Sequence, residues 1–298
     1  EYALSKFPVT MLSRFHNAIP HIFVYHTVFD TSPDHFSNLY KVRGKRGFED
    51  DLDAILNVYA PLSFAEFMSG GMTKSSRRPV CLLTFDDNNR ELYDTIAPML
   101  ERKGVPAIFF VCSAFLNNSS WFFEDQCGLI NFKVRGNESA NQRFIEYLKK
   151  EKIDWQNLVA GRLPQPRILN AIGSLLEIDW ESELSDRKPY LTDDNIHSLL
   201  RRGFAIGAHG IDHRVFSSLS VADQIKQVAE SVTAIQSKFN IPYRAFAFPY
   251  GDFGITKRTL LELRDTGLVD FVFGTRGLIE DELSPFVLQR LWCENREQ

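Results

Sequence analysis

The stretch of residues 80–111 constrains the fold more strongly than any other part of the sequence. Residues 80–85 (VCLLTF) form a short apolar run rich in β-formers, which predicts a buried strand. An amphipathic helical pattern follows at 92–100, and residues 107–111 predict a second buried strand. Such a strand–helix–strand unit belongs to a parallel sheet, in which ligands gather at the carboxyl ends of the strands.

Two adjacent carboxylates, Asp86 and Asp87, stand at the carboxyl end of the first strand. Neighbouring side chains at a strand end point in different directions, so one carboxylate can hold a metal while the other takes a proton. The structural alternative is that one aspartate only caps the following helix. Other parts of the sequence help to decide between a chemical role and a capping role for these aspartates.

The same alternation of strand and helix recurs along the chain. Thr192 and Ser220 are predicted N-caps of two of the intervening helices. Alternation of this kind, with about seven strands, predicts an α/β fold whose parallel sheet is open or closed into a barrel. We therefore interpret residues 1–298 as a single domain. The further strands are expected at 21–26, 204–208, 244–248, 269–273 and 287–291.

Residues 116–188 lack this rhythm. They contain helical patterns separated by glycine and proline, and we predict a mainly helical insertion within the domain. Trp121, Phe122 and Phe123 stand at its start. These aromatic side chains either line a cleft or pack the insertion down, and the sequence leaves both alternatives open.

Composition excludes several classes of partner. A net charge of −4 offers no basic surface for nucleic acid, and no apolar run approaches the ~20 residues of a membrane-spanning helix. The four cysteines have no paired spacing, and Cys81 and Cys112 fall in apolar strands where cysteine usually packs. This usage favours a reducing, cytoplasmic compartment, while export stays open if a leader precedes Glu1. Nothing in the composition specifies an oligomeric state.

Two histidines, His209 and His213, are four residues apart directly after the predicted strand at 204–208. Neutral imidazoles at this spacing are ordinary ligands of zinc or nickel, although the spacing alone is weak evidence. Asp87 also follows a strand end, and two histidines with one carboxylate leave open positions on a metal for water and substrate. Asp86 would then serve as the general base for the attacking water.

Three motifs stand where predicted strands end: TFDD at 84–87, HGIDH at 209–213 and AFPYG at 247–251. The turn of Pro249, Tyr250 and Gly251 can offer a backbone N–H to a developing oxyanion. With the flanking segments LLTFDD, GVPAIFFV and GFAIGAH, the chain resembles the polysaccharide deacetylases of carbohydrate esterase family 4, also called the NodB-homology domain. The family motifs are T-F-D-D-G, H-[ST]-x-x-H and R-x-P-[FY]-G.

The resemblance implies a distorted (β/α)7 barrel and a set of roles for site residues. Asp87, His209 and His213 would bind a divalent metal, with zinc favoured and nickel or cobalt as other candidates. Asp86 would be the catalytic base, and the Tyr250 backbone N–H would stabilise the oxyanion. The reaction would be hydrolysis of an N-acetyl or N-formyl group from an amino sugar in a polysaccharide or a lipid-linked glycan.

The third motif departs from the family because Ala247 replaces the arginine that holds the catalytic base. The chain looks closest to a branch of the family with FAYPYG-like third motifs. Arg290, in the last predicted strand, is our candidate to pair with Asp86. The alternative is that Arg290 is an ordinary surface residue.

The family's general acid is a histidine at the end of a C-terminal strand, whereas the C-terminal LWCEN of this chain has none. His26 ends the first predicted strand, and the first and last strands are neighbours in a closed barrel. We therefore predict His26 as the general acid. Two more departures are Gly210 in the second motif and Asn88 in the first, where we expect Asn88 to adopt the positive φ that asparagine tolerates.

Two other functions stay under consideration. One is an amidohydrolase that acts on a small non-sugar amide such as a cyclic ureide, and the intact set of Asp87, His209 and His213 argues against it. The other is a non-catalytic descendant that binds carbohydrate, which the three altered motif positions keep open. In each case we expect the insertion at 116–188 to border the cleft.

Overall fold

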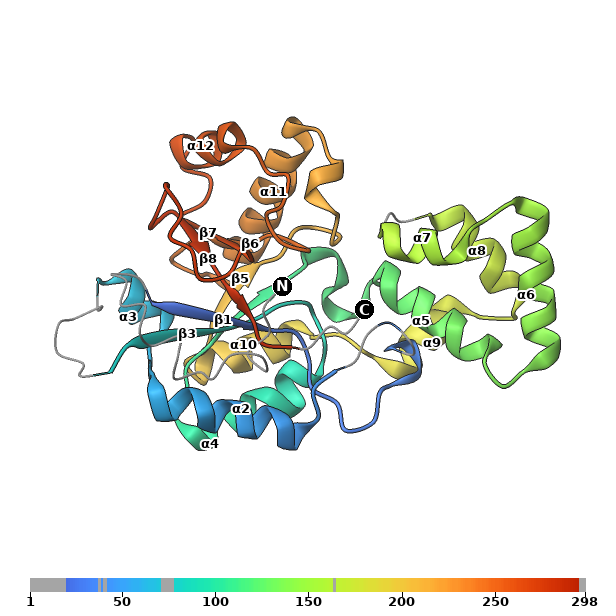
Figure 1. The fold of residues 1–298 in the computed structure, drawn as a ribbon, viewed down its shortest axis with the longest axis horizontal. Coiled ribbons are helices and arrows are strands. Elements are labelled where there is room, and N and C mark those ends of the chain that lie inside the picture. Colours follow the sequence, from blue (N-terminus) through green and yellow to red (C-terminus); the bar gives the residue numbers. More distant parts are fainter. Residues whose placement is uncertain (1–19, 37–38, 40–41, 71–77, 163–164, 295–298) are drawn as a thin grey trace.

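The computed structural model describes residues 20–36, 39, 42–70, 78–162 and 165–294 (Figure 1). Its centre is a parallel sheet whose strands follow the order β8-β7-β6-β5-β4-β3-β1-β9. A short additional strand, β2, pairs with β3. The strands are β1 (His21–Tyr25), β2 (Ala60–Pro61), β3 (Val80–Phe85), β4 (Ile108–Val111), β5 (Ala205–Ala208), β6 (Ala245–Ala247), β7 (Phe271–Gly274), β8 (Val287–Gln289) and β9 (Leu291–Trp292).

The last segment of the sheet joins its two edges. β8 pairs with β7 on one side, and β9, only one residue further along the chain, pairs with β1 on the other. The intervening residue, Arg290, donates its backbone N–H to Gly274 at 3.1 Å, and the Cys293 N–H bonds to Val24 at 3.1 Å. The prediction of a distorted (β/α) barrel is therefore confirmed.

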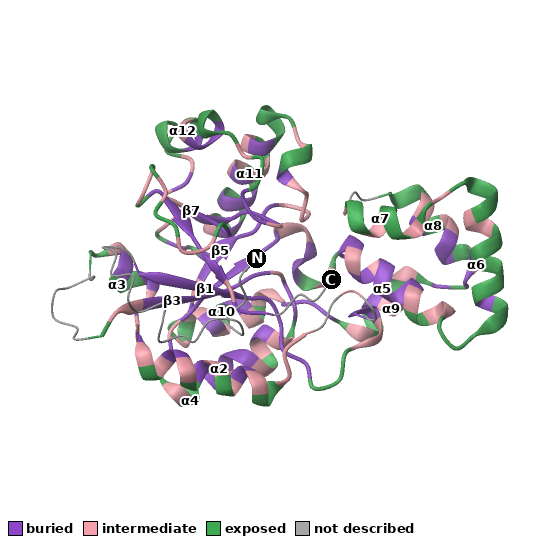
Figure 2. Ribbon diagram, in the orientation of Figure 1, coloured by how far each residue is buried: buried purple, intermediate pink, exposed green. Residues whose placement is uncertain are grey.

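Helices surround the barrel, and their apolar faces cover the buried strands (Figure 2). The Thr192 and Ser220 side chains cap helices as predicted, because each accepts a hydrogen bond from a backbone N–H three residues later. The surrounding helices are α2 (Lys45–Val58), α3 (Phe64–Met68), α4 (Ala97–Lys103), α10 (Asp193–Arg201), α11 (Val221–Phe239) and α12 (Lys257–Asp265).

The helix after β3 is irregular at its proline. Residues Leu92–Ile96 form a wider π-helical turn, and α4 continues from Ala97. Pro98 has no N–H to donate to the preceding turn, which accounts for the change of helical geometry there. Gly104 ends α4 at φ 64°, a left-handed conformation that favours glycine.

Five helices between β4 and α10 form a body beside the barrel, at the right of Figure 1. They enclose a separate apolar cluster. Trp121, Phe122 and Phe123 are all buried within this cluster, so they pack the insertion. The helices are α5 (Phe123–Val134), α6 (Glu138–Glu151), α7 (Trp155–Gly161), α8 (Pro166–Leu175) and α9 (Trp180–Arg187).

Two further observations concern the chain as a whole. All four cysteines are buried and unpaired, as predicted for Cys81 and Cys112. Among the described residues, no helix has both the length and the apolar character needed to cross a membrane.

Candidate active site

The site lies where the chain leaves the carboxyl ends of the barrel strands. Asp87 follows β3, and His209 and His213 follow β5. Their ligand atoms, one from each residue, all lie within 4.8 Å of one another. The structure thus brings together the three predicted metal ligands.

The donor set of this cluster fits a divalent metal. The Asp87 Oδ1 atom is 3.6 Å from His209 Nε2 and 3.3 Å from His213 Nε2. It is buried and accepts no hydrogen bond within the described part of the chain. A buried carboxylate oxygen without a hydrogen-bond partner, beside two imidazole nitrogens, is an arrangement that binds divalent ions such as zinc.

The ring of His209 is oriented by the end of β6. Its Nδ1 lies 2.9 Å from the carbonyl oxygen of Ala247, so Nδ1–H is the donor and Nε2 faces the carboxylates. Burial lowers the pKa of His209 to about 4, against the opposing charge of Asp86. A neutral imidazole with a fixed tautomer is prepared to bind a metal through Nε2.

Asp86 and Arg290 form a bidentate ion pair inside the barrel. Both Asp86–Arg290 hydrogen bonds measure 2.7 Å, and Arg290 is fully buried. Burial alone would raise the pKa of Asp86, but the Arg290 guanidinium holds it below its usual range. The predicted contact is present, and the surface alternative for Arg290 is wrong.

Arg290 occupies this position because it lies between β8 and β9. Its guanidinium also donates to the Thr84 hydroxyl and to the Gly274 carbonyl, each at 3.2 Å. Arg290 thus contacts Asp86 from between β8 and β9, in a chain that has alanine at position 247.

His26 stands at the end of β1, beside the last strand. Its ring stacks on Trp292 with centroids 4.7 Å apart. Its Nδ1 lies 2.8 Å from Glu294 Oε2, and its backbone N–H donates to Glu294 Oε1 at 2.9 Å. Glu294 was not singled out by sequence reasoning, although its place two residues after the last strand was an available signal.

The turn after β6 lies against the candidate metal cluster of Asp87, His209 and His213. The centroid of the Tyr250 ring is 4.5 Å from that of the His213 ring, and the Arg162 guanidinium lies 4.4 Å from the Tyr250 centroid. Among the described residues, the Tyr250 backbone N–H donates to no protein group. Gly251 has φ 94°, and a Cβ there would collide with the Thr275 hydroxyl, so only glycine fits.

Asp252 fastens this turn to the neighbouring strands. Its buried carboxylate accepts hydrogen bonds from Thr275 N at 3.1 Å, Arg276 Nε at 2.8 Å and Gln289 Nε2 at 2.8 Å. Three donors, one from β8 and two from the residues that follow β7, therefore hold one carboxylate next to Pro249, Tyr250 and Gly251.

Several candidate site residues have left-handed backbones. Asp87, His213 and Tyr250 have φ values of 71°, 56° and 57°. Such conformations cost on the order of 1–3 kcal/mol each in non-glycine residues and cluster at functional sites. Gly210, at φ 83°, stands at another such position, which accounts for glycine in the second motif.

The prediction that Asn88 adopts a positive φ is wrong. The positive φ belongs to Asp87, and Asn88 is absent from the residues with positive φ. The buried Asn88 side chain instead bonds both backbone groups of Cys112, accepting from N–H at 2.7 Å and donating to the carbonyl at 2.9 Å. It therefore ties the end of β3 to the end of β4.

The insertion also reaches the site. The Phe122 ring lies 5.2 Å from the His213 ring, and Glu124 Oε1 lies 3.7 Å from His213 Nδ1. Sequence reasoning missed Glu124, because the insertion has no strand register that would place one of its acidic side chains at the barrel.

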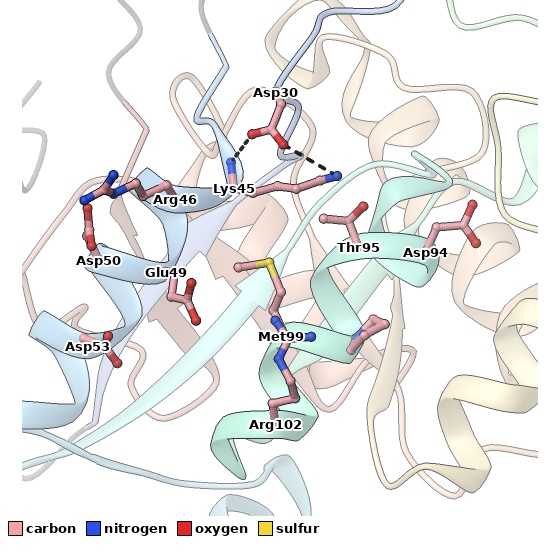
Figure 3. A pocket seen from close by; sticks show the side chains of 11 residues that line it. Asp30, Lys45, Arg46, Glu49, Asp50, Asp53, Asp94, Thr95, Met99 and Arg102 are labelled. Carbon is pink, nitrogen blue, oxygen red and sulfur yellow. Dashed lines mark hydrogen bonds and ion pairs between the residues drawn. The ribbon is translucent and has the colours of Figure 1, made fainter.

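A separate groove of about 680 Å³ runs between α2 and α4 on the outside of the barrel (Figure 3). Charged side chains of both signs line it, including the Asp30–Lys45 ion pair at 3.6 Å. It shares no residue with the candidate metal cluster, so we assign the chemistry to the strand ends and not to this groove.

Known proteins resemble this chain in sequence and in fold. A family model described as polysaccharide deacetylase matches residues 73–270, which is more than half of the chain. No curated protein matches the chain significantly.

Solved structures share the fold over almost the full chain. Deacetylase PplD of Streptococcus pyogenes in complex with acetate is 15% identical, with a TM-score of 0.58 and coverage of 92% of this chain and 91% of that chain. IcaB from Ammonifex degensii is 17% identical, with a TM-score of 0.58 and coverage of 92% and 91%. A de-N-acetylase from Aggregatibacter actinomycetemcomitans is 14% identical, with a TM-score of 0.58 and coverage of 91% and 93%.

Proposed function

Because the chain belongs to the polysaccharide deacetylase family, we propose that it uses a divalent metal to remove N-acetyl or N-formyl groups from amino sugars in a polysaccharide or a lipid-linked glycan. As a member of this family, the chain is a hydrolase of N-acetyl amide bonds. The observation that carries the proposal is the cluster of Asp87, His209 and His213 beside the Asp86–Arg290 pair.

Asp87, His209 and His213 would hold the metal, and zinc suits one carboxylate and two imidazoles, with nickel or cobalt as alternatives. When bound, the ion would polarise the amide carbonyl and promote ionisation of the attacking water.

Asp86 acts as the general base in this proposal. Its carboxylate is ionised at neutral pH because Arg290 holds its pKa low, so it can accept the proton of the attacking water. The two hydrogen bonds from Arg290 also fix its orientation.

The Tyr250 backbone N–H supports the developing oxyanion. An N–H without a protein partner, in a turn held rigidly by Asp252, is available to a substrate oxygen. Preorganised donors of this kind act where charge develops during reaction. Pro249 and Gly251 shape the turn that presents this donor.

His26 then protonates the leaving amine. Amide cleavage requires this proton because a free amide anion is too basic to leave. Glu294 holds the ring through Nδ1, and Trp292 stacks on its face. These two contacts fix the orientation of the imidazole at the end of the first strand.

A direct test is acetate release from an N-acetylated chitooligosaccharide by chelator-treated protein, with and without added zinc, nickel or cobalt. We expect activity only with metal. We also expect that His209→Ala neither retains stoichiometric metal nor turns over substrate. Full metal retention by His209→Ala, or hydrolysis of a cyclic ureide with no acetate release from glycans, would contradict the proposal.

A further inference from the structure

Two buried polar atoms face each other across the boundary between the barrel and the insertion. His213 Nδ1 and Glu124 Oε1 are 3.7 Å apart. Neither atom has a hydrogen-bond partner among the described residues. Burial of a polar atom without a hydrogen-bond partner is unfavourable, so two such atoms opposite one another indicate a hydrogen bond that forms when the site is assembled.

His209, the other candidate metal ligand, shows how a hydrogen bond at Nδ1 orients such a histidine. His209 directs Nε2 at the carboxylates because its Nδ1–H is held by the Ala247 carbonyl at 2.9 Å. A histidine that binds a metal through one nitrogen usually donates the other N–H to a carboxylate or a carbonyl. For His213, the group in this position is the carboxylate of Glu124.

The first turn of α5 presents Glu124 from a firmly held backbone. The Phe122 N–H donates to the Tyr190 hydroxyl at 3.0 Å, and that hydroxyl donates to Asp125 at 2.5 Å. The residues on both sides of Glu124 are thereby tied to a single buried tyrosine. The Phe122 ring also packs on His213, with centroids 5.2 Å apart.

We propose that Glu124 is a positioning residue for the metal site, supplied by the insertion, and that it orients His213 through its Nδ1–H. This inference rests on the proposed metal-dependent function. It makes the insertion part of the catalytic apparatus, because a barrel without α5 would have an unoriented second histidine.

The test is the affinity of the purified 298-residue chain for zinc, measured by competition with a chromophoric chelator at one pH. Glu124→Ala is expected to bind zinc ~10–100-fold more weakly. Glu124→Gln keeps an acceptor oxygen and should fall between Ala and the unchanged protein. The matched control is Glu138→Ala, which removes an exposed glutamate from the first turn of another insertion helix and should leave affinity unchanged.

A second measurement separates positioning from a loss of folding. The visible spectrum of the cobalt-loaded protein should change in Glu124→Ala and stay unchanged in Glu138→Ala, while the thermal midpoint of the metal-free protein stays the same. Wild-type zinc affinity in Glu124→Ala, or a weakened affinity that merely follows a lower midpoint, would overturn the inference. If the unaltered chain binds no metal at all, the proposed function fails first and takes this inference with it.

Discussion

The Asp86 carboxylate is buried to 2% exposure, and Arg290 compensates its charge with two hydrogen bonds. Removal of one partner from a buried ion pair typically costs 3–5 kcal/mol, whereas an isosteric neutral group keeps much of the geometry. At the scale of single residues, a neutral isostere of Asp86 therefore distinguishes a structural role of this carboxylate from a catalytic one.

Asp86→Asn is expected to retain metal and to lose hydrolysis. Asparagine can still accept a hydrogen bond from Arg290 but cannot take a proton at neutral pH. The rate should fall ~10²–10⁴-fold, the usual contribution of a general base. Metal content and acetate release should be measured on the same preparation, and a metal-loaded variant with a near-normal rate would show that Asp86 is only structural.

His26→Ala should lower amide turnover ~10²–10⁴-fold without loss of metal. An activated ester should suffer much less, because its alkoxide or phenolate leaves without a strong acid. The measurement is the ratio of amide to ester hydrolysis in the variant and in the unaltered chain. Equal losses on both substrates would place the general acid elsewhere.

At the scale of elements, the turn of Pro249, Tyr250 and Gly251 is held by Asp252, which joins it to β8 and to the residues that follow β7. Asp252→Ala leaves buried donors of Thr275 and Gln289 without their acceptor, and each unsatisfied donor costs about 1–3 kcal/mol. We expect a lower free energy of unfolding in urea and slower turnover, with zinc affinity nearly unchanged because the three ligands lie on other loops.

The control for this prediction is Asp265→Ala, which removes an exposed aspartate from the end of α12. Its unfolding and turnover should stay close to those of the unaltered chain. If Asp252→Ala were as stable and as active as this control, the turn would not depend on the buried carboxylate.

At the scale of the whole molecule, metal binding should stabilise the fold in a pH-dependent way. Burial opposes the charged form of His213, but the Asp87 carboxylate prevails and raises its pKa to about 10 in the metal-free protein. His213 therefore carries a proton at pH 6 to 8, and a metal must displace it. Each unit of pH decrease should weaken zinc affinity about tenfold.

The increase in thermal midpoint caused by zinc should accordingly be larger at pH 8 than at pH 6. Ligand stabilisation follows RT ln(1 + [L]/Kd), so it should decline by about 1.4 kcal/mol per unit of pH decrease. The measurement compares zinc-loaded with chelator-treated protein at each pH. Equal zinc-induced shifts at both values would mean that His213 is already neutral before the metal binds.

The elements of the fold were predictable from sequence because their signals are local. Apolar runs marked the barrel strands to within about two residues, a margin usual for element boundaries, and Thr192 and Ser220 marked helix starts. The proximity of Asp87, His209 and His213 was predictable for a related reason. Parallel strands end at one edge of a sheet, so polar residues after β3 and β5 must meet there.

Only the tertiary structure determined the contacts between residues that are far apart in sequence. The resemblance suggested Arg290 and His26, but the sharing of one segment between β8 and β9 brings Arg290 to Asp86 and Glu294 to His26. Glu124 lies beside His213 because the irregular insertion folds onto the barrel. No hydrophobic periodicity in the sequence predicts how the insertion packs there. A local pattern specifies which face of an element is buried, whereas the partner across that face depends on how the whole chain closes.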